Sequence, residues 1–266
     1  MEMRGLMGGL YRVCEWIMRL SVINLLWILT SLPVWYLLLV LLTAPEVEDY
    51  ETFFEQTFIL IGILSPFTLF PSTSAMFSVA RKWVMGDTDV PLLKTFFRSY
   101  RQNYRQAMLG GLLYTVLFAV LIFDYRMYAQ DIGGLGFLSM LFLFLIFLLL
   151  VSLLHFFSLL AHFHMGLLKL IRNALLLTVG RPFRTLMMAL FCAGMFWFSA
   201  QFTFLIPFFT GSVIALGVYY NFHVMLDKIM EKAEQQQKAR GDGENGGDAL
   251  EAEESRLMDE VRDKRA

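Results

Sequence analysis

Five long stretches of the chain contain no Asp, Glu, Lys or Arg: residues 20–45, 56–80, 106–123, 132–168 and 186–226. A helix needs about 20 apolar residues to cross the roughly 30 Å hydrocarbon core of a bilayer. A soluble chain has about 25% charged residues, whereas this one has 17% and a mean hydropathy of +0.58. These stretches therefore predict an all-α integral membrane protein.

The last stretch is too long for one span. A single helix over 186–226 would measure about 60 Å, twice the hydrocarbon thickness. Pro207 and Gly211 near its middle are turn-forming residues, so we predict a tight helical hairpin there. Five spans are the alternative. The predicted fold is a six-helix transmembrane bundle within a domain at 1–226, with spans near 21–43, 57–80, 106–123, 135–158, 186–206 and 211–226.

Basic residues alternate with the spans along the chain. Lys and Arg gather before the first span, in 81–105 and in 169–184, whereas 44–55 holds five acids and no base. Loops rich in Lys and Arg stay in the cytoplasm. We therefore expect a multi-pass protein of the bacterial cytoplasmic membrane with both termini inside. The highly charged residues 227–266 are expected to form a partly disordered cytoplasmic tail.

Amphipathic segments flank the predicted spans. Residues 1–20 predict an interfacial helix, and 91–105 and 169–184 predict basic cytoplasmic helices. Pro182 is expected at the start of the fifth span, where its missing N–H is tolerated. The basic helices either hold the topology and touch anionic lipid or dock a cytoplasmic partner, such as an ATPase.

Three segments resemble the YesL-like family of bacterial membrane proteins. They are GLYRVCEWIMRL at 9–20, FPSTSAMF at 70–77 and TFFRSYRQNY at 95–104, and the resemblance extends over about residues 5–226. It implies a domain of unknown function, encoded in Gram-positive bacteria beside carbohydrate ABC importers and polysaccharide-degrading enzymes. It implies no catalytic residue.

The sequence offers no catalytic motif. It contains no GxxxxGK[ST], GxSxG or HExxH pattern, so we expect no enzyme activity and no cofactor. The predicted spans contain no Asp or Glu, which argues against an ion-coupled transporter. His155, His162 and His164 lie close together, but His164 points away from His162 on a helix and no acid is near. We therefore expect interfacial histidines and no metal site, with a metal or proton role as the alternative.

The leading hypothesis is a non-enzymatic accessory subunit of a carbohydrate ABC importer. Its expected partners are membrane lipids and the permease subunits, with a cytoplasmic ATPase as a further candidate and no nucleic acid. A stand-alone sugar transporter and a membrane sensor or scaffold are the alternatives. The candidate packing or partner-binding residues are Asn24, Pro71, Ser72, Arg98, Arg101 and Arg172.

Overall fold

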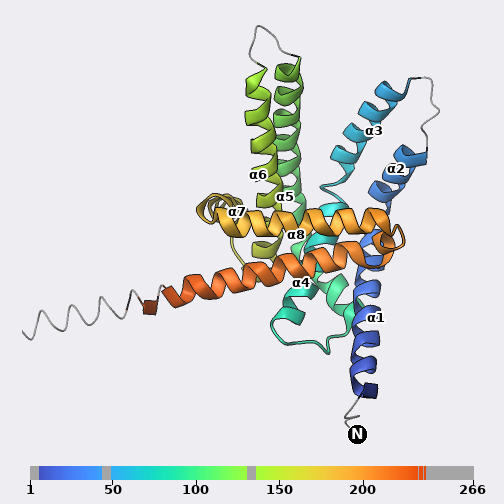
Figure 1. The fold of residues 1–266 in the computed structure, drawn as a ribbon, viewed down its shortest axis with the longest axis vertical. Helices are drawn as coiled ribbons and strands as arrows, with labels where there is room; N and C mark the ends of the chain where they lie inside the picture. The colour runs from blue at the N-terminus through green and yellow to red at the C-terminus, as the bar shows by residue number, and fades with distance from the viewer. Residues whose placement is uncertain (1–5, 44–48, 131–135, 233, 236, 238–266) are drawn as a thin grey trace, which may run out of the picture. The chain divides into compact units, whose positions relative to one another are not determined.

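The computed structural model describes residues 6–43, 49–130, 136–232, 234, 235 and 237. These ranges form helices joined by short turns, without a strand among them (Figure 1). Most of the predicted tail, residues 238–266, lies outside the described residues. The helices are α1 (Leu6–Thr30), α2 (Leu32–Thr43), α3 (Tyr50–Leu64), α4 (Leu69–Val84), α5 (Leu92–Ala129), α6 (Phe137–His162), α7 (Leu167–Gly180), α8 (Pro182–Gln201), the π-helical segment η2 (Ile206–Thr210) and the α-helical residues 211–232 that follow it.

Five helices among the described residues are long and apolar enough to cross a membrane. They lie within α1, α5, α6, α8 and Ile206–Lys232. The pair α3 and α4 meets the same test when taken together, although a 55° bend separates the two helices, so the number of spans is up to six. The all-α, multi-pass membrane fold predicted from the charge-free stretches is confirmed.

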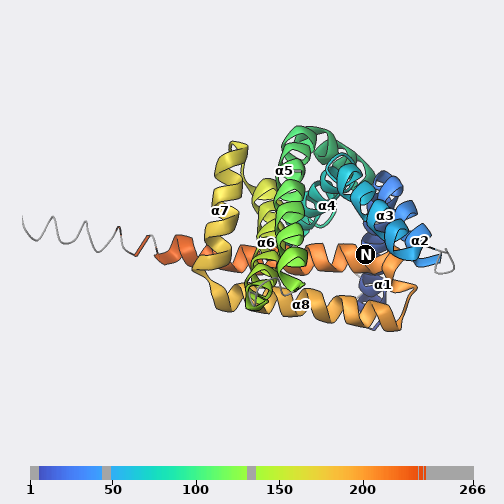
Figure 2. The same cartoon turned by 90° about the horizontal axis from the view of Figure 1, so that it is seen from above.

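Helix α4 is at the centre of the packing. It contacts α1, α5 and α6, and Figure 2 shows it beside α5. Most of its residues are buried. Its small residues Ser72, Ser74 and Ala75 are fully buried and let neighbouring helices approach closely, as is common inside membranes. The same holds on α5, where a Cβ added to Gly110 would lie only 2.3 Å from Cζ of Phe156 on α6.

Helices α5 and α6 run side by side as an antiparallel pair (Figure 1). Near the end of α5, the ring of Tyr128 stacks on that of Phe142 with centroids 5.3 Å apart. Many large apolar side chains on the outside of this pair are exposed, which suits a surface that faces lipid rather than water. Examples are Val116, Val120, Phe123, Phe137, Met140 and Phe144.

The structure differs from the predicted spans where prolines interrupt the backbone. The first predicted span is broken after Thr30, because Pro33 lies in the first turn of a new helix, α2. The second is bent between α3 and α4, where Pro66 lies in the turn. A proline removes a backbone hydrogen bond and disfavours helix in the residue before it.

The last predicted turn is misplaced by a few residues. We expected it at Pro207–Gly211, but the chain turns at 202–204 and Pro207 lies in the first turn of the next helix. A proline at that position loses no helical hydrogen bond, because the first N–H groups of a helix have no partner there. Helix α8 begins at Pro182, as expected for the fifth span.

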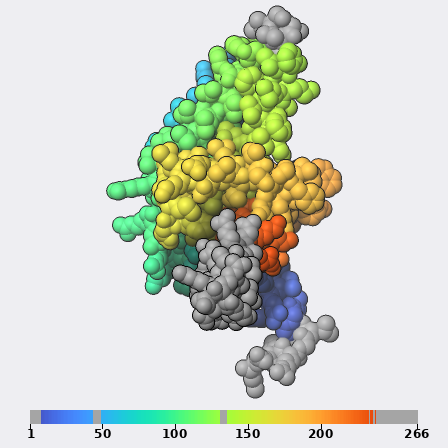
Figure 3. Space-filling model, turned by 90° about the vertical axis from the view of Figure 1, so that its left-hand side faces the viewer, coloured from blue at the N-terminus to red at the C-terminus, as the bar shows by residue number. Residues whose placement is uncertain are grey.

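The basic segment 91–105 and the span 106–123 were predicted as separate elements, but α5 contains both in one unbroken helix. Neither glycine nor proline stands between them to end the helix. The basic helix after α6 is α7, which Figure 3 shows on the surface of the molecule. Its Leu170 and Ile171 are buried, whereas Leu168 and Leu176 are exposed.

Candidate functional site

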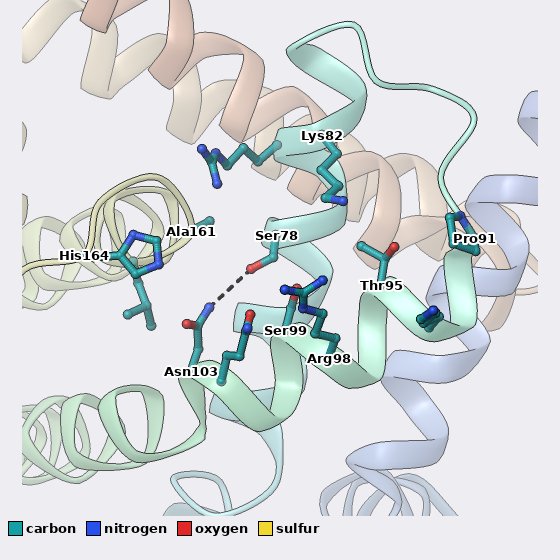
Figure 4. A pocket seen from close by; sticks show the side chains of 13 residues that line it. Ser78, Lys82, Pro91, Thr95, Arg98, Ser99, Asn103, Ala161 and His164 are labelled. Carbon is teal, nitrogen blue, oxygen red and sulfur yellow. Dashed lines mark hydrogen bonds between the residues drawn. The ribbon is translucent and has the colours of Figure 1, made fainter.

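A cavity of about 440 Å³ opens where α4 ends, α5 begins and α6 ends. Figure 4 shows the side chains arriving from these three parts of the chain, with Ser78 among them. We call this cavity the basic pocket. Its lining residues are Ser78, Arg81, Lys82, Pro91, Lys94, Thr95, Arg98, Ser99, Gln102, Asn103, Leu160, Ala161 and His164.

The end of α4 supplies one wall. Ser78, Arg81 and Lys82 are three and four residues apart and therefore share one face of the helix. Both basic residues lie in the last turn, where positive charge interacts favourably with the helix dipole. Gly86, at φ 92°, then lets the chain turn away toward α5, in a conformation that glycine adopts without strain.

The first three turns of α5 supply the opposite wall. Polar residues four apart form two adjacent rows on one face of this helix. The rows are Lys94, Arg98 and Gln102, and Thr95, Ser99 and Asn103. Phe96, which is fully buried, fixes this part of α5 against the rest of the molecule. Across the pocket, Nδ2 of Asn103 donates a hydrogen bond to Oγ of Ser78 at 3.3 Å (Figure 4).

The loop between α4 and α5 is held from outside the pocket. The guanidinium of Arg19, itself buried, donates to the Asp89 carboxylate at 2.7 Å and also pairs with Glu15. Its carbon Cζ lies 5.8 Å from the ring of Trp16. Trp16 in turn packs edge-on against Trp83 at the end of α4. These contacts fix the loop that ends at Pro91, directly before α5 and its wall of the pocket.

The basic pocket carries an excess of positive charge. None of its thirteen described lining residues is acidic, and four are Lys or Arg. Asp87 is close, but its Oδ2 lies 3.9 Å from Nζ of Lys82, which is a loose and exposed pair. Asp89 is paired with Arg19. Nε of Arg81 is buried and makes no hydrogen bond within the described chain.

The three neighbouring histidines lie in three different environments. His155 is buried on α6, and neither of its ring nitrogens has a hydrogen-bond partner among the described residues. Nδ1 of His162 shares a hydrogen bond with the Tyr219 hydroxyl at 2.7 Å. His164, beyond the end of α6, lines the basic pocket. No group of three potential metal ligands occurs in the part of the chain that the structure describes.

The candidate residues from the sequence are dispersed. Arg98, Arg101 and Arg172 are all exposed, and of the three Arg98 alone lines the basic pocket. Pro71 lies in the first turn of α4 and is buried, and the Ser72 hydroxyl donates to the Thr68 carbonyl at 2.6 Å within that helix. The sequence prediction missed the hydroxyl and amide groups that line the pocket on α5, which are those of Thr95, Ser99, Gln102 and Asn103. Their four-residue spacing along one helix face could have revealed them.

Asn24 joins α1 to the break near η2. Its Nδ2 donates to the carbonyls of Ile206 at 2.9 Å and Pro207 at 2.7 Å, and its Oδ1 accepts from the backbone N–H of Ser212 at 3.0 Å. The side chain is fully buried. A Cβ on Gly211 would come within 2.9 Å of that Oδ1. Asn24 therefore satisfies the backbone groups left by the irregular start of the last helix.

Three further pairs of polar side chains between the helices are hydrogen-bonded. Nε1 of Trp27 donates to Oγ1 of Thr73 at 3.0 Å. The hydroxyls of Tyr114 and Ser152 share a hydrogen bond of 2.8 Å between α5 and α6. Ser199 and Thr210 are joined likewise, by a bond of 2.6 Å. Interhelical bonds of this kind hold membrane helices together.

Comparison with known proteins places the chain in a family. Residues 20–125 match the family model described as "Protein of unknown function, DUF624". The chain is 31% identical to the uncharacterized protein YteU of Bacillus subtilis (strain 168) over 219 residues, which cover 81% of this chain and 84% of YteU. It is 28% identical to the uncharacterized protein YesL of the same strain over 79% of this chain and 85% of YesL. No solved structure matches significantly. The chain therefore belongs to the YesL-like family of membrane proteins, whose function is unknown.

Proposed function

We propose that this protein is a non-enzymatic accessory subunit of a carbohydrate ABC importer. One observation supports a binding role over a translocation pathway: four Lys and Arg side chains gather around the basic pocket without an acidic lining residue, whereas three polar side-chain pairs between the helices are hydrogen-bonded to each other. A transporter instead exposes polar groups to substrate near the middle of the membrane. The choice of an importer as partner comes from the gene neighbourhood that the family resemblance implies.

The proposed orientation places the basic pocket in the cytoplasm. Arg81, Lys82, Lys94 and Arg98 belong to the segment 81–105, which holds more bases than any other segment between two predicted spans. Such segments are retained on the cytoplasmic side. The pocket would then lie on the side where an importer's ATPase subunits and cytoplasmic metabolites are found.

Co-purification tests the partnership. The full chain, tagged at its natural level of expression, is isolated from native membranes in a mild detergent and its companions are identified by mass spectrometry. We expect permease subunits of a carbohydrate importer at near-equal stoichiometry. Repeated recovery of the chain without them would contradict the proposal.

Reconstitution separates the proposal from a stand-alone transporter. Liposomes that contain the purified chain alone are given labelled oligosaccharide, with empty liposomes as the control. An accessory subunit moves none, so uptake above the control would refute the accessory role. If the protein were a sensor instead, its deletion would change expression of the neighbouring genes and leave uptake by the importer intact.

A further inference from the structure

We propose that the basic pocket binds a phosphate group, carried either by a phospholipid headgroup or by a soluble phosphorylated compound. The inference rests on the geometry of α4, α5 and α6 and not on the proposed partnership with an importer. Phosphate binding and the partnership with an importer can therefore be disproved independently of one another.

Charge is the first argument. Arg81 and Lys82 on one wall face Lys94 and Arg98 on the other, around a cavity of about 440 Å³ without an acidic lining residue. Like charges brought together in this way repel one another, and an anion between them removes the repulsion. Two acids of the α4–α5 loop supply little of it, because Asp89 is paired with Arg19 and Asp87 reaches only Lys82, in an exposed pair of 3.9 Å.

The kind of donor is the second argument. Two guanidinium groups offer planar, forked donors that match phosphate oxygens, and the two ammonium groups add point charges. Hydroxyls from Thr95 and Ser99 add neutral donors, whereas the Ser78 hydroxyl already donates to the Ser74 carbonyl at 2.9 Å. One Arg81 donor, Nε, is buried and unpaired within the described chain. A buried donor without an acceptor is costly, so this atom favours a ligand rich in acceptor oxygens.

The start of α5 adds a third, independent contribution. Pro91 precedes the helix, no side chain caps its first N–H groups, and Pro91 and Lys94 both line the cavity. The positive end of the α5 dipole therefore lies at the same cavity as the four bases, which favours phosphate. The negative ends of α4 and α6 lie there too, and Arg81 and Lys82 in the last turn of α4 offset the first of them.

The same lining disfavours a neutral sugar. Sugar sites use aromatic faces together with mixed donors and acceptors, but the thirteen described lining residues include no Trp, Tyr or Phe. The cavity volume falls within the range of small-molecule sites, roughly 300–1,000 Å³. A phosphate group with an organic substituent therefore fits both the charge and the space.

The test compares two substitutions with the same change of charge on the same helix. Arg98→Gln removes a base from the pocket, and Arg101→Gln removes an exposed base outside its lining. The full chain is purified in detergent, and binding of inorganic phosphate and of glycerol phosphate is measured by calorimetry. In a second arm, the chain is placed in nanodiscs of phosphatidylcholine with or without phosphatidylglycerol, and native mass spectrometry counts the retained anionic lipids.

We expect Arg98→Gln to weaken binding at least about tenfold, as for loss of a charge-assisted hydrogen bond, and Arg101→Gln to change it less than about twofold. An effect confined to the soluble probes identifies a soluble ligand, and an effect confined to retained phosphatidylglycerol identifies a lipid. Absence of Arg98-dependent binding in both arms, or equal losses in the two variants, would overturn the proposal. Arg81→Gln provides a second pocket variant and is expected to act like Arg98→Gln.

Discussion

Asn24→Leu tests whether the structure assigns the right role to the polar residue buried in α1. Leucine keeps a branched side chain of comparable size but can neither donate nor accept a hydrogen bond. The substitution leaves the Ile206 and Pro207 carbonyls and the Ser212 N–H without their side-chain partner. Because Asn24 is fully buried, water cannot replace these bonds without a local rearrangement.

The expected loss of stability follows from three hydrogen bonds. Interhelical hydrogen bonds in membranes contribute about 0.6 kcal/mol on average and up to about 1.7. Net values in soluble proteins are about 0.5–1.5 kcal/mol each. Loss of the three bonds should therefore lower the free energy of unfolding by about 2–4 kcal/mol. The lower end is expected if the freed carbonyls find new partners.

The assay is reversible unfolding of the full chain in mixed micelles, followed by tryptophan fluorescence and circular dichroism. The matched control is Ser21→Ala on the same helix, which removes only a bond of 2.8 Å to the Ile17 carbonyl one turn earlier. We expect the free energy of unfolding of the control to stay within about 0.5 kcal/mol of that of the unmodified chain. A loss for Asn24→Leu no larger than that of the control would refute the view that Asn24 ties α1 to the last helix.

Three further predictions address packing, pairing and orientation. Gly110→Ala places a Cβ 2.3 Å from Cζ of Phe156 and should lower the free energy of unfolding by about 1–3 kcal/mol in the same assay. In the control Gly62→Ala, the new Cβ would lie 3.7 Å from its nearest neighbour, so the change should be neutral or stabilising. Equal effects of the two substitutions would contradict the close approach of α5 and α6. A double-mutant cycle of Tyr114→Phe and Ser152→Ala should give a coupling of about 0.6–1.7 kcal/mol, and zero coupling would disprove their hydrogen bond. Orientation can be tested with Met85→Cys, at an exposed position, in a chain whose native cysteines, Cys14 and Cys192, have been replaced. The new thiol should react with a membrane-impermeant maleimide in inside-out vesicles and not in intact cells. The reverse result would invert the proposed topology.

The sequence was sufficient to predict the class of fold because lipid imposes a simple rule. Long apolar stretches must become helices in a bilayer, since every backbone group needs an internal partner. Breaks within the helices were harder to place. Pro66 lies in the turn between α3 and α4, whereas Pro33, Pro71, Pro182 and Pro207 lie in the first turns of helices, where proline is tolerated. The effect of each proline depends on where the helix starts, which tertiary contacts decide.

Tertiary contacts also explain what the sequence could not reveal about the site. The rows of polar residues on α5 follow from spacing alone. Their position opposite Ser78 and Arg81 depends on the turn at Gly86, and the proximity of His164 depends on where α6 ends. Asn24 could be recognised as an unusual polar residue, but its partners lie far along the chain in η2 and beyond.

The basic pocket is the proposed ligand-binding site of this protein. A structure of the full chain with tungstate, a dense analogue of phosphate, tests it most directly. We expect strong density between the α4 and α5 walls, within hydrogen-bond distance of Arg81 and Arg98. Tungstate found only at exposed bases such as Arg101 or Arg172, with none between the two walls, would contradict it.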